Sequence, residues 1–323
     1  MVSAMPRISL RFDLRAFPGG ASHADLYAAA VDMAEYGDRH GFHGVAISEH
    51  HGVSDGYMPS PLVLAAAMAA RTKSIRLQFM AIIAPLHDPL RLAEDIAVLD
   101  NISRGRVDVT VAGGYVPFEF GMFGKEMGDR GRLTEEAIAT LKSAWTGESF
   151  EFRGRRARIT PRPFQRPHPP IWMGGSVAAA AKRAGRLADG FITHREDLYQ
   201  VYFDEAKAHG KNPWPFSASS PGFVYVTEDV EAAWTVIGPH AMHETNSYGE
   251  WVAAAGTDGR FVQVKSVEEV RAGGAYLVVT PDECVALAKS FDGLSLHPLM
   301  GGLDSEFAWK GVKLFVEKVL PRL

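Results

Sequence analysis

Short apolar runs and longer segments of helical periodicity alternate along the first third of the chain. The apolar or alternating runs have the length of strands, and they cover residues 7–14, 44–48, 75–84 and 106–112. The segments between them begin with a capping residue and predict helices over residues 22–41, 60–72 and 88–103. Strand and helix at this spacing indicate parallel strands joined by right-handed crossovers.

The same alternation continues after a glycine-rich loop over residues 113–128. Further strands are predicted over residues 170–174, 190–193, 222–227 and 292–300, and helices over residues 130–145, 177–185, 197–210 and 304–320. Eight strands, each with a helix, predict an α/β fold of the TIM (β/α)8 barrel type that forms one domain over residues 1–323. A doubly wound open sheet is the rival, but RFDLRAFPGG lacks the Gly-x-Gly-x-x-Gly turn expected after its first strand.

Two regions depart from this alternation. Residues 147–170 have the pattern of a hairpin around Arg153–Gly154, followed by a proline-rich return. Residues 228–291 are too long for a simple connection and contain polar, glycine-interrupted text. We expect a loop and helix insertion there, which is a candidate cover for the barrel.

The composition excludes several classes of protein. Hydrophobic residues make up 46% of the chain and charged residues 22%, which is ordinary for a globular protein, and the net charge is −4. Because no block of Lys and Arg is present, we expect neither nucleic acid nor a membrane as a partner. No signal peptide or membrane-spanning segment is visible, so a cytoplasmic location is expected. The single cysteine, Cys284, excludes an intramolecular disulfide.

The second predicted strand ends in three titratable residues, Glu49, His50 and His51. In a TIM barrel the active site lies at the carboxyl ends of the strands. We expect no metal site, because the chain has no His-x-His pair and no second cysteine, and adjacent strand residues point to opposite faces. A structural histidine bonded to a backbone carbonyl is the alternative for His50. The other strand ends carry few carboxylates; they include Phe12, Asp13, Ala84, Pro85, Thr193, His194 and His297.

Two glycine-rich turns follow the fourth and fifth strands. Their exposed backbone N–H groups can hold an anion, and glycine lets a ligand approach the main chain closely. Taken by itself, the second turn favours an ordinary strand-to-helix turn with Ser176 as N-cap; the cradle is favoured only when the two turns are considered together. Neither turn has a lysine, so a bound phosphate would be held mainly by backbone groups and hydroxyls, with an arginine as additional help. The residues of this candidate cradle are Ala112, Gly113, Gly114, Tyr115, Gly174, Gly175 and Ser176.

Several long blocks of the chain resemble the bacterial-luciferase-like flavin monooxygenase family. These blocks are GFHGVAISEHHG, the text from AARTKSIRLQFM to VAGGYVPFEFGMFG, and RPFQRPHPPIWMGGS. The resemblance runs from about residue 8 to 195 and resumes at 296–306, whereas residues 228–291 match poorly. It implies a TIM barrel that binds FMN, or the deazaflavin coenzyme F-420, at the carboxyl ends of the strands.

The resemblance also implies roles for single residues. His50 takes the position of the family's catalytic acid/base, and Glu49 would orient or balance its neighbours. The peptide bond between Met80 and Ala81 takes the position of a cis bond beneath the flavin ring, and the two glycine-rich turns match the phosphate loops. Bacterial luciferase has a cysteine and an arginine where this chain has Ala112–Gly113, so light emission is not implied and another group must balance the phosphate.

These observations predict a flavin-dependent monooxygenase that uses reduced FMN and molecular oxygen on an unidentified, partly apolar small molecule. No nicotinamide-binding motif is visible, so a separate flavin reductase would supply the reduced FMN. A deazaflavin-dependent oxidoreductase that transfers hydride is the alternative, and a flavin-binding protein without turnover is a second alternative. The resemblance further implies a homodimer that forms through the helix over residues 60–72.

Overall fold

A computed structural model describes residues 6–213, 221–256 and 261–323 of the chain. Contacts divide these residues into two compact units. Unit 1 contains the described residues within 1–46, 51–59 and 217–323, and unit 2 contains those within 47–50 and 60–216. No helix in the described ranges combines the length and the apolar character that crossing a membrane requires.

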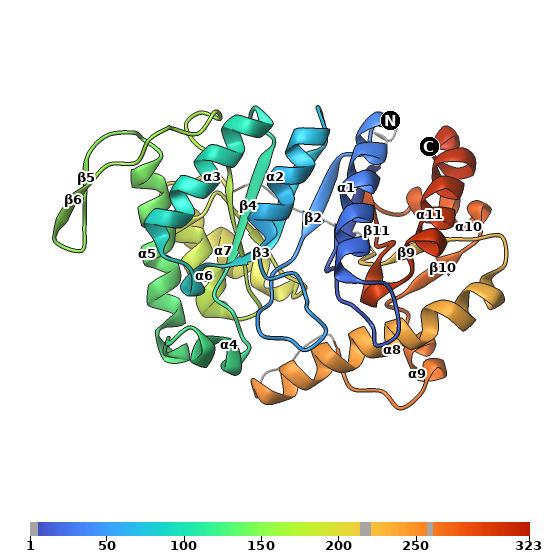
Figure 1. Ribbon diagram of the computed structural model, residues 1–323. Coiled ribbons are helices and arrows are strands. Elements are labelled where there is room, and N and C mark those ends of the chain that lie inside the picture. The colour runs from blue at the N-terminus through green and yellow to red at the C-terminus, as the bar shows by residue number, and fades with distance from the viewer. Residues whose placement is uncertain (1–5, 214–220, 257–260) are drawn as a thin grey trace. The chain divides into compact units, whose positions relative to one another are not determined.

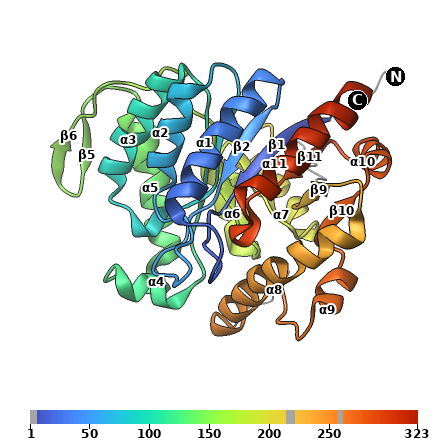
Figure 2. The same ribbon diagram turned by 45° about the vertical axis from the view of Figure 1, so that its right-hand side comes forward.

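Unit 2 is built around a parallel sheet with the strand order β3-β4-β7-β8. Helices α2 and α3 pack side by side, and α6 packs against α7 (Figures 1 and 2). The strands are β3 (Arg76–Ile83), β4 (Val107–Ala112), β7 (Ile171–Gly174) and β8 (Gly190–Ile192). The helices are α2 (Pro61–Arg71), α3 (Pro89–Ser103), α4 (Pro117–Met122), α5 (Arg130–Ala144), α6 (Ala178–Leu187) and α7 (Asp197–Ala208), with 3-10 turns at Ala84–Leu86 and Met127–Asp129.

The predicted hairpin of unit 2 is confirmed. Strand β5 (Phe150–Phe152) pairs antiparallel with β6 (Arg155–Ala157), and the chain reverses at Arg153 and Gly154, both of which have positive φ. The hairpin projects from the rest of unit 2 in both views (Figures 1 and 2). A common two-residue hairpin turn has positive φ at both central residues, and the turn here is of this kind.

Local sequence signals explain where the helices of unit 2 begin and end. The Asp88 carboxylate caps α3 by accepting hydrogen bonds from the backbone N–H groups of Leu90 and Arg91. The buried Arg106 guanidinium donates to the carbonyl oxygens of Ala69 and Thr72 at the end of α2. Because the last carbonyls of a helix have no partner within it, Arg106 completes the hydrogen bonding of α2.

Unit 1 carries strands in the order β10-β9-β11-β1-β2. Its strands are β1 (Arg7–Phe12), β2 (Gly44–Ile47, of which Ile47 belongs to unit 2), β9 (Val224–Val226), β10 (Leu277–Val279) and β11 (Gly293–Leu296). Its helices are α1 (His23–Arg39), α8 (Val230–Ala254), α9 (Val267–Ala272), α10 (Pro281–Ala288) and α11 (Ser305–Leu314). A 3-10 turn at Met300–Gly302, a π turn at Phe315–Val319 and a last turn at Leu320–Arg322 complete it. Helix α9 lies beside α8 in both views (Figures 1 and 2).

Strand β10 lies within residues 228–291, where the sequence predicted only a loop and helix insertion. It pairs in parallel with β9, with Leu277 opposite Val224, and helix α10 follows it. This region therefore supplies a strand and a helix to unit 1 in addition to α8 and α9, while residues 257–260 lie outside the described part. The strand is no shorter than β8 and β9, which the sequence did predict. It was missed because the polar, glycine-interrupted text around it favoured an insertion.

The core of unit 1 lies against β9, β10 and α8. It gathers aromatic and aliphatic side chains that are less than 10% exposed, including Phe223, Trp234, Ile237, Tyr276 and Val278. The members from α8, such as Trp234 and Ile237, lie in the first half of that helix, so burial of this area holds the first half of α8 in place.

Candidate functional site

The chain that leaves β2 places one histidine beside a carboxylate. Nδ1 of His50 lies 2.9 Å from Oε1 of Glu119, and both side chains are buried. Because a carboxylate only accepts hydrogen bonds, the imidazole donates from Nδ1, and Nε2 is then the proton-accepting nitrogen of the neutral ring. The ring of Tyr115 stands nearly perpendicular to that of His50, with 5.9 Å between the ring centres. His50 therefore has the geometry of an oriented acid/base.

Glu119 is a candidate site residue that the sequence analysis missed. It lies in the first turn of α4 and is fully buried, while the next residue, Phe120, packs with Ile83 and Leu86. The whole stretch over residues 113–128 had the composition of a glycine-rich loop. The available signal was Pro117 at a helix start, followed by a glutamate between two phenylalanines.

Glu49 makes different contacts. Its Oε2 accepts a hydrogen bond from the backbone N–H of Ile83 at 2.7 Å, and its Oε1 lies 2.7 Å from Nε2 of His87. These bonds join the end of β2 to the end of β3. Burial opposes the charged form of His87, but the hydrogen bond and the charge of Glu49 raise its pKa above the usual value. His51, the last of the three titratable residues that follow β2, is buried and belongs to unit 1.

The two predicted glycine-rich turns lie at neighbouring strand ends. Strand β4 pairs in parallel with β7, and the pair Ala112–Gly174 brings the turns together. Gly114 has φ +72°, and a Cβ atom there would lie 2.8 Å from Cγ2 of Ile83. A Cβ atom at Gly175 would lie 2.4 Å from Cβ of Ala180. Glycine is therefore required at both positions by the space around them.

Ser176 does not cap the helix that follows, which corrects one reading of the second turn. The N-cap of α6 is Val177, and among the described residues no side chain bonds to the helix start there. Ser176 is partly exposed. Its hydroxyl is thus not used in capping, and the predicted role in ligand binding stays a prediction.

Arg130 is a second residue that the sequence analysis did not single out. It begins α5, and its Cγ and Cδ atoms lie 4.0 Å from the position that a Cβ at Gly113 would take. The hydroxyl of Thr134 lies 3.5 Å from the same position and donates to the backbone carbonyl of Arg130. The Arg130 guanidinium makes no hydrogen bond or ion pair with the part of the chain that the structure describes. Arg130 is therefore an arginine that lies next to the turn after β4.

Strand β3 carries an accessible apolar side chain. The peptide bond between Met80 and Ala81 is cis, at the position that the resemblance implied. Met80 is 41% exposed, and its sulfur accepts a hydrogen bond from Thr110 at 3.6 Å. Along this strand Leu77 and Phe79 are buried and Met80 is not. The side chains alternate between the two faces because successive strand residues point in opposite directions.

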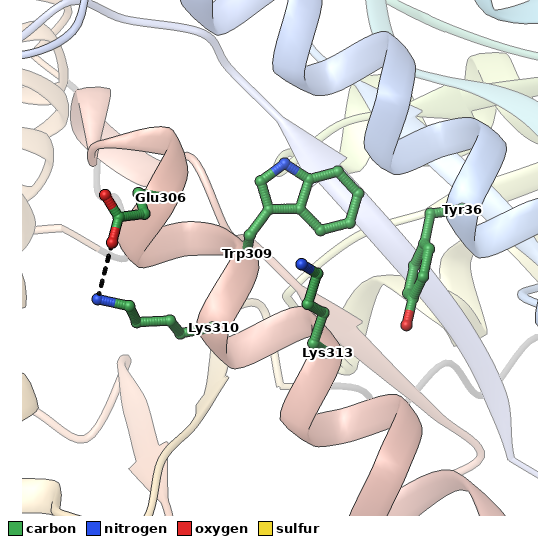
Figure 3. Close-up of a pocket in the computed structure, with 5 residues that line it drawn as sticks. All are labelled: Tyr36, Glu306, Trp309, Lys310 and Lys313. Carbon is green, nitrogen blue, oxygen red and sulfur yellow. Dashed lines mark ion pairs between the residues drawn. The ribbon is translucent and has the colours of Figure 1, made fainter.

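A surface groove of about 480 Å³ lies in unit 1 and is lined by residues of α1 and α11 (Figure 3). Trp309 stands edge-on to Tyr36, with 5.3 Å between ring centres, and the Lys313 ammonium lies 5.6 Å from the Trp309 ring centre. Glu306 and Lys310 form an ion pair along its edge. None of the predicted site residues lines this groove, so it is not part of the candidate site.

The chain was compared with families of known proteins. The model of a family described as luciferase-like monooxygenases matches residues 10–286. The chain belongs to this family. The resemblance seen in the sequence is thereby confirmed, and the match also includes most of residues 228–291, which showed little resemblance when read alone.

Two curated relatives illustrate the range of activities near this chain. The oxygenase component of the flavin-dependent trigonelline monooxygenase of Acinetobacter baylyi is 30% identical over 174 residues, which are 52% of this chain and 48% of the relative. The F-420-dependent glucose-6-phosphate dehydrogenase of Nakamurella multipartita is 25% identical over 317 residues, which are 91% of each protein. The chain spans about half the length of the trigonelline enzyme component and of two further relatives that it matches.

A solved structure supports the fold over nearly the whole chain. Monooxygenase RslO1 from Streptomyces bottropensis has a TM-score of 0.80 to this structure and 28% sequence identity. The alignment covers 98% of this chain and 99% of that one. The predicted fold class is confirmed by this likeness.

Proposed function

We propose that the protein is a flavin-dependent monooxygenase that uses reduced FMN and molecular oxygen on a partly apolar small molecule. The pairing of His50 with buried Glu119, in the same unit as a glycine cradle with an adjacent arginine, is the observation that carries this proposal. Membership in the luciferase-like monooxygenase family supports it. When bound, the flavin supplies the chemistry that activates oxygen, and the protein supplies position and electrostatics.

The residues of unit 2 fit a flavin phosphate. A Cβ atom added at Gly113 would have no neighbour closer than the Thr134 hydroxyl at 3.5 Å among the described residues, and the Arg130 guanidinium has no competing partner among them. We infer that Gly113, Gly114, Gly175, Ser176 and Arg130 hold the phosphate through backbone N–H groups, a hydroxyl and one charge. The remaining predicted contacts, to the ring system and its chain, are those of Met80, Ala81, Ala112, Tyr115 and Gly174.

His50 is the proposed acid/base, and Glu119 is its positioning residue. The hydrogen bond from Nδ1 to Glu119 fixes the ring orientation, so that proton transfer takes place at Nε2. The sequence analysis assigned Glu49 to catalysis. In this proposal Glu49 instead supports the site, because its bonds to Ile83 and His87 hold the residue that precedes His50 in place.

A deazaflavin-dependent hydride transfer is the second candidate. It is favoured by the F-420-dependent relative from Nakamurella multipartita, which aligns over 91% of both chains. The same cradle and the same histidine serve either cofactor, because both carry a phosphate on a ribityl chain. The cofactor preference therefore separates the two functions.

We further propose a homodimer, a separate flavin reductase as partner and a cytoplasmic location. The trigonelline monooxygenase relative is named as an oxygenase component, which fits a reaction divided between two proteins. Helices α2 and α3 expose large apolar side chains, namely Val63, Val98 and Ile102, and these form the proposed dimer face.

The deciding experiment is a fluorescence titration of the purified protein with oxidised FMN, reduced FMN under anaerobic conditions, riboflavin and coenzyme F-420. Preferential binding of reduced FMN supports the monooxygenase. Preference for F-420 replaces it with the hydride-transfer function. Binding of none of these compounds contradicts both.

A further inference from the structure

A second cluster of polar side chains lies within unit 1, at the carboxyl ends of two paired strands. Asp13 follows β1 and His297 follows β11, and these strands run parallel with Leu10 opposite Leu296. Nε2 of His297 lies 3.5 Å from Oδ1 of Asp13. Glu244 of α8 completes the cluster, because one ligand atom from each of the three side chains lies within 4.8 Å of the others. The three side chains thus converge on one point.

Arg15 belongs to the same cluster and is held there by the chain. Its Nε lies 3.3 Å from Oδ2 of Asp13, and its Nη1 donates to Oδ2 of Asp55 at 3.3 Å. Leu14, with φ +52°, turns the chain between Asp13 and Arg15, so that both side chains reach the cluster. The guanidinium also lies 4.6–5.1 Å from the ring centres of Tyr57, Tyr248 and Trp251.

Most polar atoms of this cluster make no hydrogen bond with the residues that the structure describes. They are both carboxylate oxygens of Asp13, Nε and Nη2 of Arg15, and both ring nitrogens of His297. These three side chains are at most 1% exposed. Four of these atoms face one another in the ion pairs of Asp13 with Arg15 and His297, whereas Nη2 of Arg15 and Nδ1 of His297 have no polar partner among the described residues. Native proteins satisfy nearly all buried donors and acceptors, so these two atoms indicate groups that a bound molecule satisfies.

The charges of the cluster nearly balance without a bound ion. Two guanidiniums, those of Arg11 and Arg15, face three carboxylates, those of Asp13, Asp55 and Glu244. His243 is the polar partner of Asp55, with Nε2 at 2.8 Å from Oδ2. Burial raises the pKa of Asp13, but His297, Arg15 and Arg11 together lower it to about 2, so that Asp13 is an acceptor with a full charge.

This balance identifies the kind of ligand. A cation would satisfy Asp13 and His297 but would be repelled by Arg15. An anion would bond to Arg15 but would be repelled by Asp13 and Glu244. A neutral group that both donates and accepts hydrogen bonds matches donors and acceptors together, and it adds no charge to the buried site.

We propose that Asp13, Arg15 and His297 form a binding site for a hydroxyl or carboxamide group of a small organic molecule. That this molecule is the enzyme's substrate rests on the proposed function, because strand ends of this fold class are where substrates bind. The Phe223 ring, whose centre lies 6.2 Å from that of His297, offers an apolar surface beside the polar group. The site selects substrates with a polar end attached to an apolar body.

The test uses the full chain labelled with 15N-histidine and three aromatic probes of similar size: phenol, benzamide and toluene. The ring signals of His297 are assigned by their loss in His297→Gln. We expect phenol and benzamide to move these signals saturably, and toluene to bind roughly 10- to 100-fold more weakly, because it leaves the polar atoms unmatched. His297→Gln and Asp13→Asn should each weaken phenol binding by roughly tenfold or more.

The control is His240→Gln, which removes another histidine of unit 1 whose Nδ1 already bonds to the carbonyl oxygen of Gly301. It should leave phenol binding unchanged. Toluene binding as tight as phenol, or no binding of any probe, overturns the proposal. Saturable binding of Zn²⁺ or Mn²⁺ that His297→Gln abolishes overturns it in favour of a cation site. Titration of the same samples with FMN tests the proposed function separately, because the FMN contacts proposed above lie in unit 2.

Discussion

Glu119, fully buried in the first turn of α4, holds Nδ1 of His50 at 2.9 Å. The two residues are 69 positions apart in the chain, and only the fold brings them together. A histidine at the end of a strand is by itself as compatible with a structural role as with a catalytic one. The buried carboxylate favours the catalytic role. It selects the tautomer in which Nδ1 donates to Glu119, and this leaves Nε2 as the nitrogen that exchanges a proton.

The first prediction concerns this tautomer. In Glu119→Leu, His50 loses its acceptor at Nδ1, and we expect the neutral ring to move to the Nε2–H form. Glu119→Gln is the matched control, since its amide oxygen still accepts and should preserve the Nδ1–H form. The 15N chemical shifts of the imidazole distinguish the two forms. An unchanged tautomer in Glu119→Leu would remove Glu119 from the proposed positioning role.

The same variants should separate orientation from cofactor binding. We expect Glu119→Leu to lower turnover by up to about 100-fold, because the acid/base is no longer oriented. FMN affinity should stay unchanged, since the carboxylate is assigned no contact with the cofactor. A parallel loss of FMN affinity would indicate that Glu119 supports the fold of the cradle instead.

The second prediction concerns Arg130. Arg130→Ala should weaken FMN binding by roughly 10- to 100-fold, the value of a charge-assisted hydrogen bond, and should leave riboflavin binding unchanged because riboflavin has no phosphate. The control is Arg132→Ala in the same helix, since the Arg132 side chain is 65% exposed and pairs with Asp129. Fluorescence titration measures all three proteins. Equal losses for FMN and riboflavin would contradict the assigned phosphate contact.

The sequence predicted much of the fold because its signals were local. Strand-length apolar runs, Ser22 and Asp88 as helix caps and the Arg153–Gly154 reversal were all read correctly, and each depends on a few adjacent residues. Strand β10 was missed, since the polar, glycine-interrupted text around it favoured an insertion. Ser176 was read as a possible helix cap, but Val177 takes that position.

The candidate site was only partly predictable for a related reason. His50 and the glycine turns stand in motifs that resemble a known family, so the sequence could name them. Glu119 and Arg130 reach the site through packing of α4 and α5. Glu119 lies inside a block that resembles the family, but nothing in that block marks it as the partner of His50, and Arg130 lies outside the quoted blocks. The partners of a catalytic histidine and of a phosphate are set by tertiary structure, which a single sequence does not show.

The third prediction concerns the space around Gly114, one of the cradle glycines. Gly114→Ala places a methyl group 2.8 Å from Ile83 in a left-handed backbone conformation, and we expect the free energy of unfolding to fall by roughly 2–4 kcal/mol. Gly124→Ala is the control: its φ is +62° but no atom lies within 4 Å of the added Cβ, so about 1 kcal/mol is expected. Urea denaturation measures both. If both substitutions lowered the free energy of unfolding equally, the space around Gly114 would not restrict the residue at that position.

The fourth prediction concerns the dimer. The Val63 side chain on α2 is 72% exposed, and replacing it with glutamate should shift a dimer to monomer in sedimentation velocity, because a buried charge at the interface is unpaired. Val262 has the same exposure, 73%, but lies in unit 1, and Val262→Glu should leave the dimer intact. A monomeric wild type would contradict the proposed α2–α3 face.

The last prediction is the pH dependence of the Glu49–His87 pair. The folded protein raises the pKa of His87 above its unfolded value of about 6.5, because the Glu49 bond and charge outweigh the burial of the ring. The pair therefore stabilises the fold fully below pH of about 6.5, and this contribution is lost as the pH rises through the folded pKa. His87→Gln should be less stable than the wild type in acid, and the difference in free energy of unfolding should narrow toward alkaline pH. Glu49→Gln should remove the same pH-dependent part, since an amide carries no charge. A difference that grows as the pH rises would mean that His87 is held neutral in the folded protein, and that Glu49 serves only to anchor the strand ends.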